Sequence, residues 1–155
     1  MLKLYRPALD ELWFRRELLL DADTMSYNQK WGGVISFPKE KWSGWYDRWV
    51  AGNELGRFYR YLTDTVGDKF IGEAAYHYDD ARGIYLCDVI VHARYRGNGY
   101  GTEGLRLLCE AAKENGVAVL YDDIAVDNPA LRLFLKNGFA VEYETDDAVT
   151  VKRAL

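Results

Sequence analysis

The strongest constraint on the fold is the segment from Ile84 to Val91, in which apolar residues follow one another almost without interruption. A strand with one face in water alternates apolar and polar residues, whereas a strand covered on both faces does not. Asp88 is the one charged residue in the segment. The pattern therefore predicts a central strand of a sheet, with an unusual carboxylate in it.

Helical and extended patterns are interleaved along the rest of the chain, which favours a mixed α/β sheet. Apolar residues at helical spacing predict a first helix that starts at Pro7, and the Asn-Gly pair at 115–116 ends a later one. A turn at residues 79–83 joins two strands into an antiparallel hairpin. Strands are expected at 2–6, 57–63, 69–78, 84–92, 117–126, 139–144 and 148–152, and helices at 7–20, 42–49, 105–115 and 129–137.

The length of 155 residues and the hydrophobic content of 49% suit a single domain, residues 1–155, that buries a real core. The predicted class is α/β (α+β), with a central mixed, mostly antiparallel sheet of about seven strands flanked by about four helices. The net charge of -4 disfavours nucleic acid as a partner and favours a cationic one.

No apolar run approaches the roughly 20 residues of a membrane-spanning helix, and the first seven residues lack the apolar stretch of a signal peptide. A soluble, cytoplasmic protein without a membrane partner is expected. Cys87 and Cys109 lie within apolar patterns and have no neighbouring ligand at a metal spacing. They are therefore predicted to be reduced core residues, and no metal site is expected.

A glycine cluster from Arg96 to Thr102 lies between the buried strand and the helix that follows it. Such a turn leaves backbone N–H groups unpaired at the positive end of a helix, where a pyrophosphate can approach closely. The spacing is Arg-x-x-Gly-x-Gly, which matches neither the dinucleotide fingerprint nor the Walker loop. Glycines in a plain tight turn would explain the cluster equally well.

Two ordered motifs make the interpretation specific. The run from Val89 to Gly101 resembles the main signature of the GNAT family of N-acetyltransferases, and the run from Asn128 to Phe139 resembles its second signature, an Asn-led helix that ends in Gly-Phe. The order of the flanking elements also follows that family. The resemblance is weakest over residues 21–53, where these proteins diverge to suit their acceptors.

The resemblance implies that acetyl-CoA, the co-substrate, lies in a V-shaped opening between the strand of Ile90 and Val91 and the strand that ends at Val126. The pantetheine arm would pair with the first strand, and the amides from Arg96 through Thr102 would hold the pyrophosphate. The expected cofactor residues are Ile90, Val91, Arg96, Gly97, Asn98, Gly99, Tyr100, Gly101, Thr102, Asn128, Phe134 and Lys136. Helix capping by Asn128 and a solvated Lys136 are the alternatives.

The resemblance further implies direct attack by an amine on the thioester in a ternary complex. Many members of the family carry a tyrosine, the acid for the thiol, where this chain has Phe134. A phenyl ring donates no proton, so that role falls to water, to no group, or to another tyrosine. The candidates are Tyr85, Tyr100 and Tyr143.

The candidate general bases are Glu73 and Asp88, because each is a carboxylate within an otherwise apolar strand pattern, where an unpaired charge is costly. Each could instead pair with a basic residue or face solvent. His77 and His92 are interpreted as polar residues at strand ends. Asp122 and Asp123 are adjacent, so at least one of them points away from the expected face.

Aromatic residues predict the acceptor. Trp42, Trp45, Tyr46 and Trp49 share one helical face, which is typical of a core but could, with Trp31 and acidic residues, hold a protonated amine. The expected acceptor is a small polyfunctional amine, such as a polyamine or an aminoglycoside. The alternatives are a protein N-terminus or lysine, and a module that binds acyl-CoA without turnover. A homodimer is compatible with each.

Overall fold

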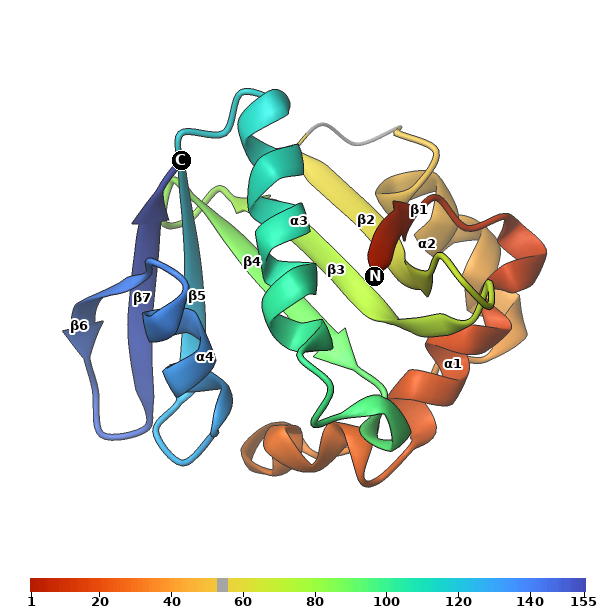
Figure 1. The fold of residues 1–155 in the computed structure, drawn as a ribbon, viewed down its shortest axis with the longest axis horizontal. Coiled ribbons are helices and arrows are strands. Elements are labelled where there is room, and N and C mark those ends of the chain that lie inside the picture. Colours follow the sequence, from red (N-terminus) through yellow and green to blue (C-terminus); the bar gives the residue numbers. More distant parts are fainter. Residues whose placement is uncertain (53–55) are drawn as a thin grey trace.

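The computed structural model describes residues 1–52 and 56–155, and the side chains of residues 30 and 31 are also outside the description. One seven-stranded sheet runs through the molecule in the order β1-β2-β3-β4-β5-β7-β6 (Figure 1). Five strand pairs are antiparallel and one, β4 with β5, is parallel. The strands are β1 Leu2–Tyr5, β2 Arg57–Asp64, β3 Phe70–Asp79, β4 Ile84–Val91, β5 Val119–Ala125, β6 Ala140–Glu144 and β7 Ala148–Ala154. The predicted fold class is confirmed.

Helices cover both faces of the sheet. Figure 1 shows α3 and α4 on the near face and α1 and α2 behind the sheet. Each face has its own apolar core, one including Leu105 and Phe134, the other including Phe14 and Trp45. The α-helices are α1 Trp13–Leu20, α2 Trp42–Trp49, α3 Tyr100–Glu114 and α4 Ala130–Lys136, and the 3-10 turns are η1 Leu9–Glu11, η2 Thr24–Trp31, η3 Lys39–Lys41 and η4 Ala93–Tyr95.

β4 is the central strand that its apolar sequence predicts. It lies between β3 and β5, with Cys87 buried in the core below α3 and Ile90 buried in the core on the opposite face. Cys87 and Cys109 are both free and buried. Burial on the two faces explains why apolar residues do not alternate with polar ones in this strand.

The first helix differs from its prediction. Pro7 does not begin an α-helix, because α1 begins at Trp13 after the 3-10 turn η1. The hydroxyl of Tyr46 donates a 2.7 Å hydrogen bond to the carbonyl of Pro7, and the Glu11 carboxylate accepts a 2.9 Å bond from the Ala8 amide. These contacts tie the segment to α2 and to its own turn instead of to a helical ladder.

Two other segments also differ from their predicted form. Residues 24–31, expected as part of a loop, form the 3-10 run η2. Pro129 directly precedes α4 instead of opening it, although the Asn128 side chain still accepts a 2.9 Å hydrogen bond from the Ala130 amide. No helix among the described residues combines the length and the apolar character that crossing a membrane requires.

The parallel pair β4–β5 is short. Only Tyr85 with Leu120 and Leu86 with Tyr121 are in register, and both strands continue beyond these pairs. The rest of β4 therefore separates from β5, and its edge on that side is left without a strand partner. This separation creates the site.

Candidate active site

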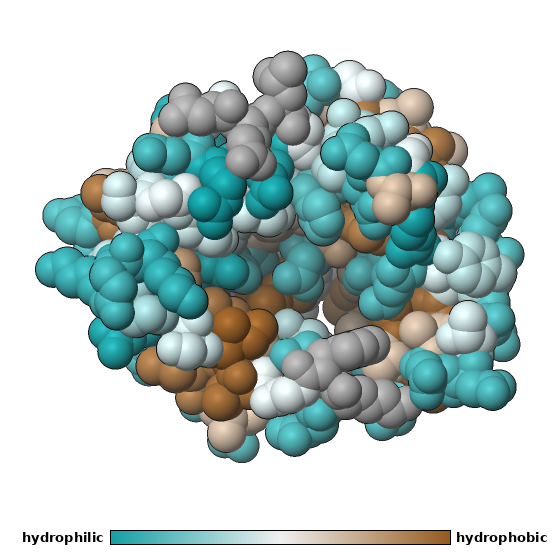
Figure 2. Space-filling view, turned by 180° about the vertical axis from the view of Figure 1, so that it is seen from behind, coloured by the Kyte–Doolittle hydropathy of each residue, from teal (hydrophilic) through white to brown (hydrophobic). Residues whose placement is uncertain are grey.

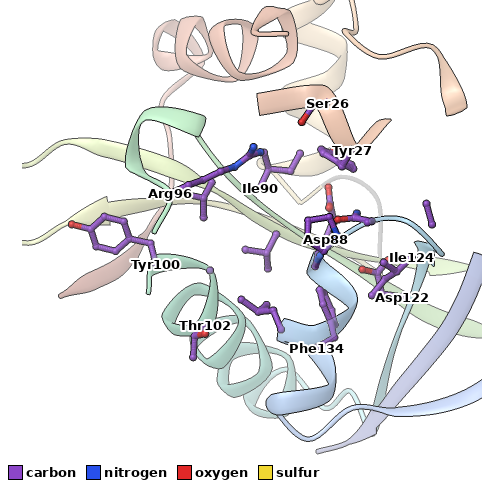
Figure 3. Close-up of a pocket in the computed structure, with 18 of the residues that line it drawn as sticks. Ser26, Tyr27, Asp88, Ile90, Arg96, Tyr100, Thr102, Asp122, Ile124 and Phe134 are labelled. Atoms are coloured by element: carbon purple, nitrogen blue, oxygen red, sulfur yellow. Dashed lines mark hydrogen bonds between the residues drawn. The ribbon is translucent and has the colours of Figure 1, made fainter. Parts of the chain in front are cut away.

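A cavity of about 600 Å³ fills the space where β4 and β5 separate. Its walls come from both strands, from the start of α3, from α4 and from η2 (Figure 3). Ile90 and Val91 line it, as expected, and their other strand edge pairs with Glu73 and Gly72 of β3. The backbone of β4 thus presents unpaired hydrogen-bonding groups to the cavity, which an extended ligand can satisfy.

The glycine loop lies at one end of the cavity. Gly97 and Gly99 adopt left-handed φ angles of 82° and 79°, and Gly99 precedes α3 directly. Within the described residues, none of the backbone N–H groups from 97 to 102 donates a hydrogen bond to the protein. A run of free donors at the positive end of a fifteen-residue helix is suited to a pyrophosphate.

The other predicted cofactor residues divide into two groups. Arg96, Gly97, Gly99, Tyr100, Gly101, Thr102, Asn128 and Phe134 line the cavity, whereas Asn98 and Lys136 do not. The side-chain Nδ2 of Asn98 donates instead to the Tyr95 carbonyl at 2.9 Å. The Arg96 guanidinium donates to the carbonyls of Asp23 and Thr24 at 3.1 and 2.7 Å, which joins the glycine loop to η2.

Phe134 forms part of the cavity wall with 3% of its surface exposed, and its ring packs 4.9 Å from the ring of Phe139. Among the three tyrosines considered in its place, Tyr100 lines the cavity, whereas Tyr85 and Tyr143 are not among its lining residues. Tyr85 packs against Tyr76, and the Tyr143 hydroxyl accepts a hydrogen bond from Arg82.

A second cavity of about 200 Å³ lies on the face of the sheet that carries α1 and α2. That side of the molecule is hollowed near its centre (Figure 2). Tyr27, Asp88 and Ile90 line both cavities, so the two spaces meet at these three residues. Tyr27 comes from η2, and Figure 3 shows it next to Asp88.

Tyr27 was not predicted from the sequence. It lies in the divergent segment, and no local pattern there distinguishes it from its neighbours. Burial, and then the charge of Asp88, raise the pKa of its hydroxyl well above the ordinary value. The hydroxyl therefore stays protonated at neutral pH and can donate a hydrogen bond.

Four carboxylates line the larger cavity, Asp88 from β4, Asp122 and Asp123 from β5, and Asp127 from the loop after β5. Solvent reaches Asp88 through the open cavity, but protein surrounds it on its other sides. Although Asp88 is exposed to the cavity, desolvation by the protein atoms packed around it, and then the Glu73 charge, raise its pKa to about 7. Burial and the Asp88 charge raise the pKa of Asp122 well above its ordinary value.

Asp123 also lines the larger cavity, but its side chain lies on the opposite side of β5 from that of Asp122, because neighbouring residues of a strand face opposite sides. Its carboxylate accepts hydrogen bonds from Arg82 at 2.5 Å and from Thr150 at 2.6 Å. These partners lower the pKa of Asp123, although its partial burial acts in the other direction. Asp122 and Asp123 therefore have different environments despite being adjacent.

Glu73 lies on the wall of the smaller cavity and is only 3% exposed. The Nη1 atom of Arg15 donates to both of its carboxylate oxygens at 2.8 Å, and the Tyr59 hydroxyl donates to Oε2. No such ion pair is found for Asp88 within the described residues. The two candidate bases are thus in contrasting states, one neutralised and one uncompensated.

The histidines also differ from each other. His92 is buried, and its Nδ1 accepts a hydrogen bond from the Arg94 amide at 3.3 Å, so it caps a turn after β4. His77 lies within β3, lines only the smaller cavity and packs edge-on to Trp49. Burial and the Arg57 charge lower the pKa of His77.

The aromatic residues of α2 contribute to the core and to the smaller cavity. Trp42 and Trp45 are buried, and Trp45 and Trp49 line the cavity. The side chain of Trp31, which was also considered for the acceptor site, lies outside the described part of the chain. Trp45 is therefore both a core residue and part of the cavity wall, whereas Trp42 belongs to the core alone.

Comparisons with known proteins agree with this geometry. The model of the acetyltransferase (GNAT) family matches residues 14–139. The chain is similar to a GNAT-family acetyltransferase from Bacillus anthracis, with 16% identity, a TM-score of 0.77 and coverage of 99% of this chain and 94% of that one.

Two further solved structures share the fold. The yncA protein of Salmonella typhimurium, solved with its cofactor acetyl-CoA, is 20% identical with a TM-score of 0.75, covering 100% of this chain and 94% of that one. A spermidine N-acetyltransferase chimera of Vibrio cholerae SpeG and hSSAT is 16% identical with a TM-score of 0.77, covering 99% and 95%.

The free amides before and within the first turn of α3, the unpaired edge of β4 and the size of the larger cavity all fit acetyl-CoA. The family model extends over most of the chain, from α1 to the end of the second signature. The chain therefore belongs to the GNAT family of acetyltransferases and is an acetyl-CoA-dependent N-acetyltransferase.

Proposed function

We propose that this enzyme acetylates the primary amine of a small molecule that is cationic in solution, by direct attack within a ternary complex. The observation that carries the proposal is the meeting of two cavities at Asp88. The larger one has the features of a cofactor site, and the smaller one opens from the opposite face of the sheet. An amine in the smaller cavity and a thioester in the larger one would meet beside a carboxylate.

Asp88 is the proposed general base. A pKa of about 7 leaves its carboxylate partly ionised at neutral pH, which is the range in which a base both accepts and releases a proton readily. Glu73 is less suited, because Arg15 and Tyr59 already occupy its oxygens. His77 lines only the smaller cavity, further from the junction than Asp88.

The remaining residues of the site hold and orient acetyl-CoA. Acetyl-CoA supplies an acetyl group activated as a thioester. The amides of residues 97–102 bind phosphate, the free edge of β4 at Ile90 and Val91 aligns the arm, and Asn128 borders the same cavity. The ammonium group first gives one proton through Asp88 to water, and the neutral amine then attacks the thioester. The regenerated Asp88 carboxylate takes the second proton as the bond to the acetyl carbon forms, and the Tyr27 hydroxyl offers a hydrogen bond where the sulfur departs. The sulfur finally receives its proton from water.

The free, buried state of Cys87 and Cys109 supports the cytoplasm as the proposed location, because reducing compartments keep such thiols unpaired. The test of the function is release of free thiol from acetyl-CoA in the presence of small amines, short peptides or neither. Turnover with small amines supports the proposal. Turnover with peptides alone, or acetyl-CoA binding without any turnover, contradicts it.

A further inference from the structure

The charge of the smaller cavity limits what it can accept. Two carboxylates line it, but Glu73 is neutralised by Arg15 through two hydrogen bonds of 2.8 Å. His77 is kept neutral by burial and by the neighbouring Arg57. Asp88 is therefore the one carboxylate in this wall, among the described residues, that can balance a positive charge on a ligand.

The tryptophan rings that could hold a second ammonium group already contact other groups of the protein. Trp45 and Trp49 stack on each other with centroids 6.0 Å apart and planes 18° apart. The guanidinium carbon of Arg15 lies 4.4 Å from the centre of the Trp45 ring, and that of Arg57 lies 4.7 Å from the centre of Trp49. The electron-rich faces thus carry cations from the chain itself, and an additional cation would meet like charge.

The rest of the wall is apolar or aromatic. Away from its charged pair, the cavity is bounded by side chains that offer contact area but no charge. These include Leu19, Met25, Ile35, Leu86 and Ile90. A ligand body made of methylene groups or an aromatic ring matches such walls better than a body that carries further ammonium or hydroxyl groups.

We propose that the acceptor is a monoamine with an apolar body, of the alkylamine or arylalkylamine class, and that the cavity discriminates against polyamines and aminoglycosides. This inference rests on the proposed acetyl transfer to small amines. In this binding mode the amine makes one charge contact, with Asp88, and apolar contacts with the rest of the wall. The tryptophan rings do not bind it by cation–π contact.

A pair of amines of equal size provides the test. Hexylamine and 1,5-diaminopentane have the same number of non-hydrogen atoms and differ in a terminal methyl or ammonium group. We expect kcat/KM for hexylamine to exceed that for the diamine by at least tenfold, with phenethylamine also a substrate and spermidine a poor one. Equal or greater activity with the diamine overturns the inference while leaving acetyl transfer intact. Failure of every amine refutes the proposed function itself.

A variant then tests the charge argument directly. Ile35 lines the cavity and is 44% exposed, so Ile35→Asp adds a third carboxylate, the second without an ion-pair partner, and does not disturb the core. We expect it to raise the diamine-to-monoamine ratio of kcat/KM at least fivefold. The matched control is Val34→Asp, a neighbouring residue that is 46% exposed and does not line the cavity. An identical ratio in the two variants counts against the inference.

Discussion

Arg15 and Glu73 are joined by two hydrogen bonds of 2.8 Å that run from one guanidinium nitrogen, Nη1, to both carboxylate oxygens. The pair lies between α1 and β3, and the Glu73 side chain is 4% exposed. A carboxylate held in this way is part of the wall of the smaller cavity. Its neutralisation leaves Asp88 as the carboxylate of that wall, among the described residues, without an ion-pair partner.

Breaking the Arg15–Glu73 pair should lower the free energy of unfolding more than it lowers catalytic activity. Glu73→Gln leaves the Arg15 charge buried without compensation, which destabilises folded proteins by about 3 to 5 kcal/mol. Urea unfolding should show a loss of this size. The double variant Arg15→Met, Glu73→Met removes both charges and should recover most of the loss. A single variant as stable as the wild type would show that the pair is not a buried one in solution.

Replacing the proposed base should lower activity much more than stability. Asp88→Asn should lower kcat/KM by about 10² to 10⁴-fold, the usual contribution of general base catalysis. The fold should be retained, because Asn has the same shape. Asp80→Asn, in the exposed turn between β3 and β4, is the control. Activity near that of the wild type in Asp88→Asn would exclude Asp88 as the base.

The pH profile gives an independent check on Asp88. Its pKa is raised to about 7, so the carboxylate is protonated below that pH and ionised above it. A base acts in its ionised form, and kcat/KM should therefore rise as pH increases through about 7. The limb that belongs to this group should be absent from the residual activity of Asp88→Asn. A wild-type profile that falls through the same range would contradict the assignment.

Substitutions at two glycines with similar backbone angles distinguish an effect on cofactor binding from an effect of backbone strain. Gly99 has φ 79° at the start of α3, and Gly116 has φ 87° just after its end, each with open space around it. An Asp at either position costs about 1 to 2 kcal/mol of left-handed strain. Gly99→Asp also places a negative charge beside the free amides, so its affinity for acetyl-CoA should fall at least tenfold in calorimetry. Gly116→Asp should bind normally, and equal affinities would refute the pyrophosphate site.

The hydroxyl of Tyr27 should matter for turnover more than for binding. Tyr27→Phe should lower kcat by about tenfold to a hundredfold, at the low end for loss of a preorganised donor, with little change in the KM for acetyl-CoA. Adding Phe134→Tyr restores a hydroxyl to the cavity wall from α4 and should recover part of the rate. Tyr143→Phe, outside the cavity, is the control. An unchanged kcat in Tyr27→Phe would leave water alone in this role.

The elements of the fold could be predicted because their patterns are local. The apolar run of β4, the glycines after it and the Asn-led helix each lie within a few consecutive residues. The first helix begins later than its sequence pattern predicts, and the contact of Tyr46 with the carbonyl of Pro7 joins residues 39 positions apart. Tertiary contacts of that range leave no local signal in the sequence.

For the site, the sequence by itself determined the chemistry at the cofactor end, since free amides follow from a glycine turn into a helix. Tertiary structure decided the charges in the smaller cavity. Glu73 and Asp88 are equivalent as sequence, each a carboxylate in an apolar strand, and the difference between them comes from Arg15, 58 residues from Glu73. Tyr27 likewise reaches the junction only because η2 packs there. Charge compensation depends on distance in space, which the sequence alone does not specify.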